Sequence, residues 1–213
     1  MNSRPRVLGA DYSVYVRIVR LALEQKGVDY ELVPVDVFAP GGPPAWYLQN
    51  HPFGRIPAFE HGDFRLFEAD AITRYVDEAF DGPSLQPSEP RARARMNQII
   101  GMLDAYAYRA LVWDVYVERV SRPKRGEAPD QARISNGLQM AATCLATLAQ
   151  LKASGSWLLG QQLTLADLHA APMFAYFSRA PEGRDLIAQH PSIDQWWNGV
   201  GGLASFVATE FAE

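Results

Sequence analysis

The residues best suited to chemistry lie in two short stretches that follow one another closely. Asn50–Phe59 reads Asn-His-Pro-Phe-Gly-Arg-Ile-Pro-Ala-Phe, and Leu66–Ile72 reads Leu-Phe-Glu-Ala-Asp-Ala-Ile. The second stretch is predicted to begin a helix at Glu68 and Ala69, where free N–H groups and the helix dipole favour a bound carboxylate. The Glu68 side chain can pair with an ammonium group. A ligand that carries both groups fits this pattern, although an acid at a helix start also has a purely structural explanation.

Proline and glycine fix the backbone of the first stretch before Ala58 and Phe59 enter a strand. Pro57 has no N–H, which suits a strand entrance where the backbone turns outward toward a ligand. Because X–Pro bonds can be cis, we expect a cis bond between Ile56 and Pro57.

The elements that must position these residues alternate between short strands and helices. A strand over Arg6–Gly9 leads into a helix over Val14–Lys26, which Gly27 ends. Three further strands and a further helix are predicted at Tyr30–Val35, Ile56–Phe59, Phe64–Phe67 and Ala69–Phe80. For residues 1 to about 82 we expect a four-stranded mixed sheet with three helices, two of which are the helices placed above.

Beyond a Gly- and Pro-rich linker at 81–87, the chain gives only helical signals. Ser88 is predicted to cap a long helix that has Pro90 in its first turn and ends near Val120. A second helix is predicted over about Pro129–Ala153. From residue 90 onward we expect no strand.

Thr164 and Asp167 have the spacing of a capping box at the start of a later helix. Leu163 and Leu168 stand where a hydrophobic staple needs them. This pattern is structural and assigns no chemistry.

The residue composition and net charge of the chain argue against several classes of protein. The 213 residues are 48% hydrophobic and 21% charged, as in ordinary globular proteins. A net charge of −4 gives no general attraction to nucleic acid or anionic membranes. The first residues are too few for a signal-peptide core, and no apolar run is long enough to span a bilayer. With Cys144 as the single cysteine and no metal-ligand spacing among the histidines, we expect a cytoplasmic protein without disulfides or a metal.

The stretch around Pro57 and Glu68 resembles the glutathione-binding half of the cytosolic glutathione transferases, whose motif runs Asn-Pro-Phe-Gly-x-Val-Pro and then Phe-Glu-Ser. Thr164-Leu-Ala-Asp167 is similar to the capping box in the sixth helix of that family. The resemblance is to a phi- or theta-like, serine-type, bacterial-looking member. It implies an α/β thioredoxin-like N-terminal domain over 1–82, followed by an all-α helical C-terminal domain over 90–213.

The resemblance also implies a function. It points to an enzyme that conjugates the glutathione thiolate to small hydrophobic electrophiles, with a role in detoxification, and to a homodimer. Glutathione serves as co-substrate, without a metal. Glu68 and the N–H of Ala69 would bind the γ-glutamyl ammonium and carboxylate. The backbone of Ile56, before Pro57, would pair with the cysteinyl part, and Arg55 would lie alongside.

Three departures from the family pattern concern this binding site. Ala69 lacks the usual hydroxyl and with it one hydrogen bond to a charged group, worth roughly 1.5–3 kcal/mol. The loop that carries a basic pair in phi-class enzymes here reads Gly-Gly-Pro-Pro over Gly41–Pro44. His51 stands in place of the asparagine before the family's proline.

Ser13 is the residue expected to hold the thiolate, because its spacing from Gly9 and Arg17 resembles that of the catalytic serine of phi-class transferases. Lowering a thiol pKa by two units requires ~2.7 kcal/mol. A hydroxyl that donates to a charged sulfur supplies ~1.5–3 kcal/mol, and a helix N-terminus adds ~0.3–1 kcal/mol. Ser13 could instead serve only as a helix cap. Tyr12 is the competing donor, ahead of Tyr15.

Two other classes of function remain open from sequence. A non-enzymatic protein of this fold would bind hydrophobic ligands or another protein. A thiol-disulfide oxidoreductase or dehalogenase-like relative would differ in reaction, and the oxidoreductase is disfavoured because no cysteine lies near residues 11–15. Four aromatic residues of the long helix are assigned to packing, with one or two available to line an electrophile pocket: Tyr106, Tyr108, Trp113 and Tyr116.

Overall fold

The computed structural model describes residues 3–211, which divide into two compact units. The first unit runs up to Gln86 and also contains the segment that begins at Leu203. The second unit is Pro87–Gly202. The chain therefore leaves the first unit after Gln86 and comes back to it more than a hundred residues later.

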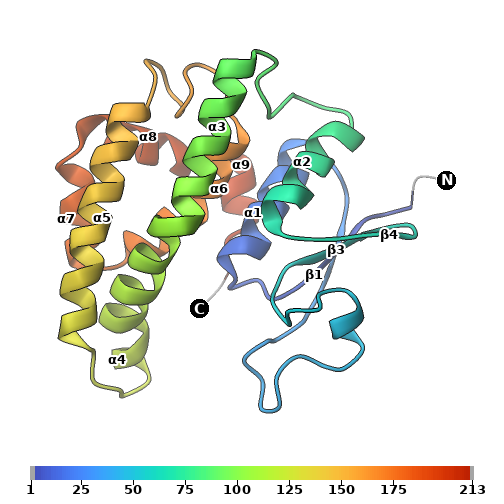
Figure 1. The fold of residues 1–213 in the computed structure, drawn as a ribbon, viewed down its shortest axis with the longest axis horizontal. Helices are drawn as coiled ribbons and strands as arrows, with labels where there is room; N and C mark the ends of the chain where they lie inside the picture. The colour runs from blue at the N-terminus through green and yellow to red at the C-terminus, as the bar shows by residue number, and fades with distance from the viewer. Residues whose placement is uncertain (1–2, 212–213) are drawn as a thin grey trace. The chain divides into compact units, whose positions relative to one another are not determined.

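A four-stranded mixed sheet forms the centre of the first unit (Figure 1), in the order β2-β1-β3-β4. β1 and β2 are parallel and the other two pairs are antiparallel. The strands are β1 (Arg6–Leu8), β2 (Glu31–Val33), β3 (Ala58–His61) and β4 (Phe64–Phe67). The predicted mixed sheet is confirmed. The third strand begins two residues later than predicted, because Pro57 has no N–H to contribute to a ladder.

Helices cover both faces of this sheet. They are α1 (Val14–Gln25), the single 3-10 turn η1 (Tyr47–Gln49), α2 (Ala69–Ala79) and, from the returning segment, α9 (Ala204–Ala208). α1 and α2 pack against each other, and Figure 1 shows them on the side of the sheet opposite η1. On the η1 side, Tyr47 packs with Leu8, Val35 and Ala58 in a buried cluster.

The second unit begins with a long helical run (Figure 1). It consists of α3 (Pro90–Met102), the π-helical segments η2 (Leu103–Ala107) and η3 (Arg109–Ser121), and α4 (Arg122–Lys124). The predicted cap at Ser88 is wrong. Glu89 is the cap, and its carboxylate accepts hydrogen bonds from the N–H groups of both Arg91 and Ala92. A carboxylate has two oxygens for this purpose, whereas a serine hydroxyl has one.

The rest of the second unit packs around one buried helix. It contains α5 (Gln131–Leu151), α6 (Leu165–Phe177), α7 (Pro181–Ala188) and α8 (Pro191–Gly201). Nearly every residue of α6 is buried, as expected for a helix that is apolar on all sides. The predicted capping box of Thr164 and Asp167 is confirmed.

All regular elements after residue 90 in the described chain are helices, and Trp157 and Gly160 add an isolated bridge. Within residues 3–211, no helix is both long enough and apolar enough to cross a membrane.

Candidate functional site

The register of the sheet brings three sequence-distant positions to one edge of the first unit. Leu8 pairs with Ala58, and Ala58 pairs with Phe67 on its other side. Because these three residues stand in one row across the sheet, the residues that adjoin them lie at the same edge. Those residues are Gly9, Pro57 and Glu68. The predicted ligand-binding stretches and the strand that leads to Ser13 therefore meet.

The loop before β3 is held in a fixed conformation. The Ile56–Pro57 bond is cis, which confirms the prediction from the sequence. The Tyr47 hydroxyl donates a hydrogen bond to the carbonyl oxygen of Arg55 over 2.6 Å. Gly9 allows β1 to end close to this loop and to α1, because a Cβ atom there would clash with the Val16 side chain and would lie 3.3 Å from the Cβ of Ile56.

Glu68 has an unusual backbone for a residue with a side chain. Its φ of 71° is the only positive φ of a non-glycine residue within the described chain. Such a conformation is costly, and where it persists it often marks a functional site. Glu68 precedes the first residue of α2, yet its side chain does not cap the helix. No hydrogen bond or ion pair engages this exposed carboxylate among residues 3–211, so it is available to a cation.

The neighbours of Glu68 complete an acceptor and donor set. Ala69 is buried and its N–H begins α2, so the amides of this first turn face a site where an anion is favoured. Asp70, the acid of that turn, is paired with Arg74 over 2.6 Å. Arg55 is exposed and forms no ion pair within the described residues.

Ser13 stands at the start of α1 and caps it. The N–H of Val16 donates to the Ser13 Oγ over 3.4 Å, which is a long hydrogen bond, and the N–H of Arg17 donates to the Ser13 carbonyl over 2.9 Å. In these contacts Ser13 only accepts. Its hydroxyl hydrogen therefore remains available for donation to an anion that also faces the N-terminus of α1.

Tyr12 lies beside Ser13, but its hydroxyl is committed elsewhere. It donates a hydrogen bond to the Asp36 carboxylate over 2.8 Å, and its ring stacks on Phe38 at 6.1 Å between centroids. Burial, followed by the hydrogen bond to Asp36 and the negative charge of Asp36, raises the pKa of Tyr12. A phenol with one hydrogen, bound to a carboxylate, is a poor second donor to a thiolate.

Two residues that hold parts of the candidate site were not predicted from the sequence. Tyr47 holds the Arg55 carbonyl, and Asp36 accepts both the Tyr12 hydroxyl and the N–H of Phe38, the latter over 2.8 Å. The spacing of Asp36 and Phe38 is that of a local Asx turn, which is detectable from sequence. The contacts with Tyr12 and Arg55 depend on the tertiary fold, so no local signal reports them.

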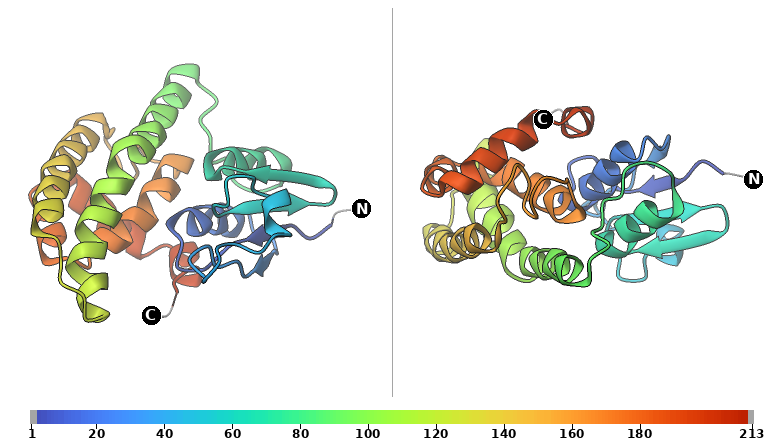
Figure 2. Two further views of the ribbon diagram at one scale, coloured as in Figure 1. Left: turned by 60° about the horizontal axis from the view of Figure 1, so that its bottom comes forward. Right: turned by 90° about the horizontal axis from the view of Figure 1, so that it is seen from above.

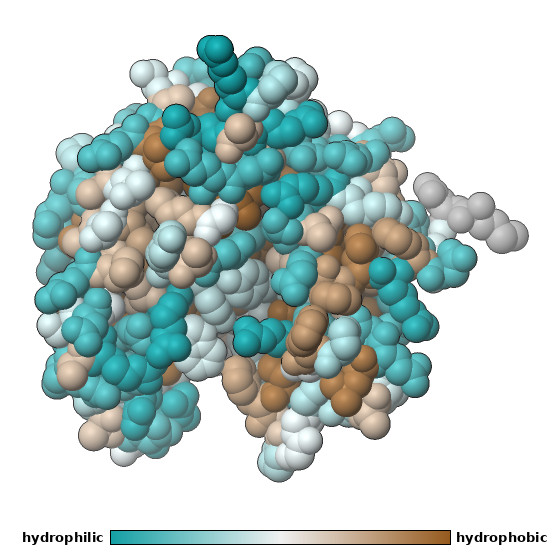
Figure 3. All heavy atoms as spheres, viewed as in Figure 1, coloured by the Kyte–Doolittle hydropathy of each residue, from teal (hydrophilic) through white to brown (hydrophobic). Residues whose placement is uncertain are grey.

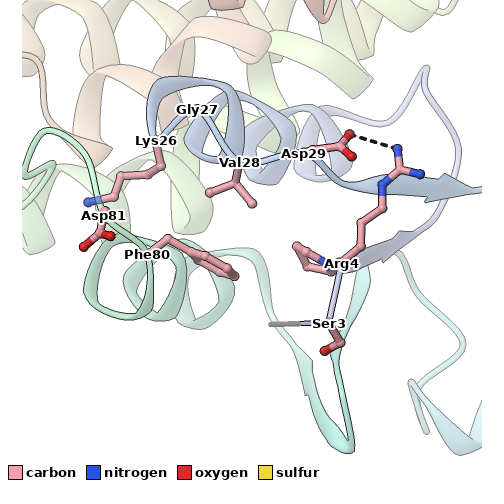
Figure 4. Close-up of a pocket in the computed structure, with 9 residues that line it drawn as sticks. Ser3, Arg4, Lys26, Gly27, Val28, Asp29, Phe80 and Asp81 are labelled. Carbon is pink, nitrogen blue, oxygen red and sulfur yellow. Dashed lines mark hydrogen bonds and ion pairs between the residues drawn. The ribbon is translucent and has the colours of Figure 1, made fainter. Parts of the chain in front are cut away.

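A polar cavity of about 380 Å³ occurs at the other end of α1, away from Ser13 (Figure 4). Its lining includes Arg4, Lys26, Asp29 and Phe80. Arg4 is paired with Asp29 over 2.9 Å, and the ammonium of Lys26 contacts the Asp77 carboxylate over 3.2 Å. These charges are already matched within the fold, and the cavity is separate from the candidate site.

Comparison with known proteins agrees with this geometry. Two family models match: the glutathione S-transferase N-terminal domain over residues 7–84 and the glutathione S-transferase C-terminal domain over 131–197. The chain is 29% identical to glutathione S-transferase F13 of Arabidopsis thaliana, with 95% of this chain and 93% of the relative covered.

Solved structures give the same result. The structure of glutathione S-transferase III in apo form matches with a TM-score of 0.85 and 30% identity, covering 97% of this chain and 95% of the other. Glutathione S-transferase I from mais, in complex with an atrazine glutathione conjugate, matches with a TM-score of 0.84 and 25% identity, covering 97% and 96%. The chain belongs to the glutathione S-transferase family.

Proposed function

We propose that this protein conjugates the thiolate of glutathione to small hydrophobic electrophiles. The observation that carries the proposal is the meeting, at one sheet edge, of the cis Ile56–Pro57 bond with the exposed carboxylate of Glu68. Ser13 begins the helix that follows the neighbouring strand. One structural neighbour, glutathione S-transferase I from mais, is in complex with an atrazine glutathione conjugate, and that conjugate is a product of the proposed class.

The γ-glutamyl and cysteinyl parts of glutathione have partners in this proposal. The Glu68 carboxylate binds the γ-glutamyl ammonium, and the N–H groups from Ala69 onward bind the γ-glutamyl carboxylate. The backbone of Ile56 pairs with the cysteinyl part because it precedes the β3 ladder, and Arg55 lies alongside. Ala69 supplies no hydroxyl, and Gly42 and Pro43 supply no charge to the glycyl carboxylate.

The proposed chemistry is nucleophilic substitution or addition by sulfur. Ser13 donates its hydroxyl hydrogen to the sulfur and so stabilises the thiolate, while the thiol proton passes to solvent. The sulfur then forms a bond to the electrophilic carbon, and in a substitution the leaving group departs with the bonding electron pair. The commitment of Tyr12 to Asp36 supports Ser13 over Tyr12 as the donor.

Glu68→Gln tests the binding half of this proposal. Removing the charge that pairs with the ligand ammonium should weaken glutathione binding by roughly tenfold or more, since a hydrogen bond between charged groups contributes ~1.5–3 kcal/mol. Titration calorimetry measures the change. Asp63→Asn, the same loss of one carboxylate in the turn between β3 and β4, should leave the affinity unchanged. Equal affinity in Glu68→Gln would contradict the assignment.

We also infer the broader properties that accompany this function. The protein is proposed to be a serine-type, bacterial-looking, cytoplasmic detoxification enzyme. Its proposed domains are a glutathione-binding domain over 1–82 and a helical domain over 90–213, from which the segment after Leu203 returns to the first unit. A homodimer is proposed because four large apolar side chains near η1 are exposed: Phe38, Trp46, Leu48 and Phe53. Figure 3 shows hydrophobic residues gathered on this side of the first unit. Light scattering would give the mass in solution.

A further inference from the structure

The segment after Leu203 completes the unit that contains the candidate site. α9 lies beside α1 in both views of Figure 2, and the two helices are in contact. Nothing in the local sequence of α9 indicates this position. Its partners lie almost two hundred residues earlier in the chain.

A buried arginine joins the two helices. Arg17 of α1, only 4% exposed, donates from Nη2 to the Phe206 carbonyl over 2.8 Å and from Nε to the Thr209 hydroxyl over 3.3 Å. Its guanidinium carbon also lies 4.1 Å from the centre of the Phe206 ring. The planar guanidinium thus uses its donors and its face at once, which a lysine could not do.

Further polar contacts follow along α1. Arg20 donates to the Thr209 carbonyl over 3.3 Å, and Gln25 donates to the Ser205 hydroxyl over 2.6 Å. The last carbonyl groups of a helix have no partner within it, and the helix dipole favours cations near them. Arg17 and Arg20 meet both needs of α9, so its short length does not leave these groups unsatisfied.

Arg17 is also one helical turn after Ser13, and its N–H donates to the Ser13 carbonyl. Holding the Arg17 side chain therefore holds the first turn of α1. We propose that α9 acts as a strap and that Arg17 is a positioning residue, which together fix the hydroxyl of Ser13 against glutathione. This inference rests on the role of Ser13 in the proposed function.

Thr209→Val tests the strap with little change of volume. Thr209 is fully buried, and the variant removes the acceptor of the Arg17 Nε. Val207→Thr is the matched control, because it makes the reverse change at an exposed position of the same helix. Amide hydrogen exchange of the first turn of α1 and the pKa of the bound glutathione thiol, read from thiolate absorbance, are measured in the full chain.

We expect Thr209→Val to speed exchange in the first turn of α1 and to raise the thiol pKa, with kcat/KM lowered by about fivefold, as for the loss of one typical intramolecular hydrogen bond. Val207→Thr should match the parent. Arg17→Lys should repeat the effect, since it keeps the charge but not the geometry.

Ser13→Ala, measured in parallel, separates the two proposals. Unchanged exchange in both Thr209→Val and Arg17→Lys overturns the strap, whatever Ser13→Ala does. Faster exchange without a change in thiol pKa, when Ser13→Ala does raise that pKa, overturns the positioning role. If Ser13→Ala itself leaves the thiol pKa unchanged, the role of Ser13 fails, and the positioning claim fails with it.

Discussion

His51 lies in an aromatic cluster beside the charged residues of the candidate site. It is 3% exposed, its ring centroid is 4.9 Å from that of Phe67, and it stacks on Tyr47. Its Nδ1 has no hydrogen-bond partner within the described residues. Burial lowers the pKa of His51; the charge of Arg55 lowers it further, while the charge of Glu68 opposes both. The imidazole is therefore neutral at pH 7.

This environment predicts a pH dependence of stability. The pKa of His51 in the folded protein is below its unfolded value of about 6.5. As the pH falls below about 6.5, the unfolded chain takes up the proton first, so the free energy of unfolding decreases until the folded pKa is reached. His51→Asn removes this contribution. Urea unfolding of both proteins between about pH 5 and 8 measures it. Parallel curves for the parent and His51→Asn would show that His51 does not contribute.

A second prediction at the residue scale concerns the effect of Pro43 on glutathione affinity. The loop at Gly42 and Pro43 carries no cation, so Pro43→Lys should tighten glutathione binding, by up to about tenfold if its ammonium reaches the glycyl carboxylate. Pro83→Lys makes the same change in the linker and should have no effect. Calorimetry compares the dissociation constants. If Pro43→Lys binds glutathione like the parent, the loop is away from the ligand or Arg55 already serves the glycyl end.

At the scale of elements, local sequence signals predicted the end of a helix correctly where a single residue determines it. The first helix was predicted to end at Lys26 before Gly27, and α1 ends at Gln25 with Gly27 at a φ of 66°. The 3-10 turn η1 was not located, because a single turn leaves no periodic pattern. The π-helical segments after Met102 were also missed, since their apolar spacing resembles that of an α-helix.

The contacts of Asp167 predict how strongly the stability of the second unit depends on one helix-capping residue. Its buried carboxylate accepts hydrogen bonds from three residues: from the Leu158 N–H, from the Thr164 N–H and hydroxyl, and from the Trp196 indole. Asp167→Ala leaves these buried donors without an acceptor, so we expect a loss of about 3 kcal/mol or more in the free energy of unfolding. Glu89→Ala removes an exposed cap and should cost only ~0.5–2 kcal/mol. Denaturant unfolding of both variants tests this order, and equal losses would contradict it.

At the scale of the whole molecule, the sequence predicted the fold class and the meeting of Pro57 with Glu68, because a tight hairpin relates them. It could not predict that α9 returns to the first unit. The Arg17 contact with Phe206 joins residues 189 positions apart. A five-residue helix is too short for a periodic apolar pattern that would indicate which element it packs against. The order of strands and helices along the chain can thus be predicted from the sequence. The contacts that hold the first turn of α1 are visible only in the structure.

The central claim is that Ser13, rather than Tyr12, stabilises the glutathione thiolate. Its most direct test is the ultraviolet absorbance of the bound thiolate against pH in the parent, Ser13→Ala and Tyr12→Phe. We predict that Ser13→Ala raises the apparent pKa of the bound thiol by roughly one to two units, as expected for a lost hydrogen bond of ~1.5–3 kcal/mol to a charged sulfur. Tyr12→Phe should stay close to the parent, because its hydroxyl is bound to Asp36. An unchanged titration in Ser13→Ala, with a shift in Tyr12→Phe alone, would contradict the claim and assign the role to Tyr12.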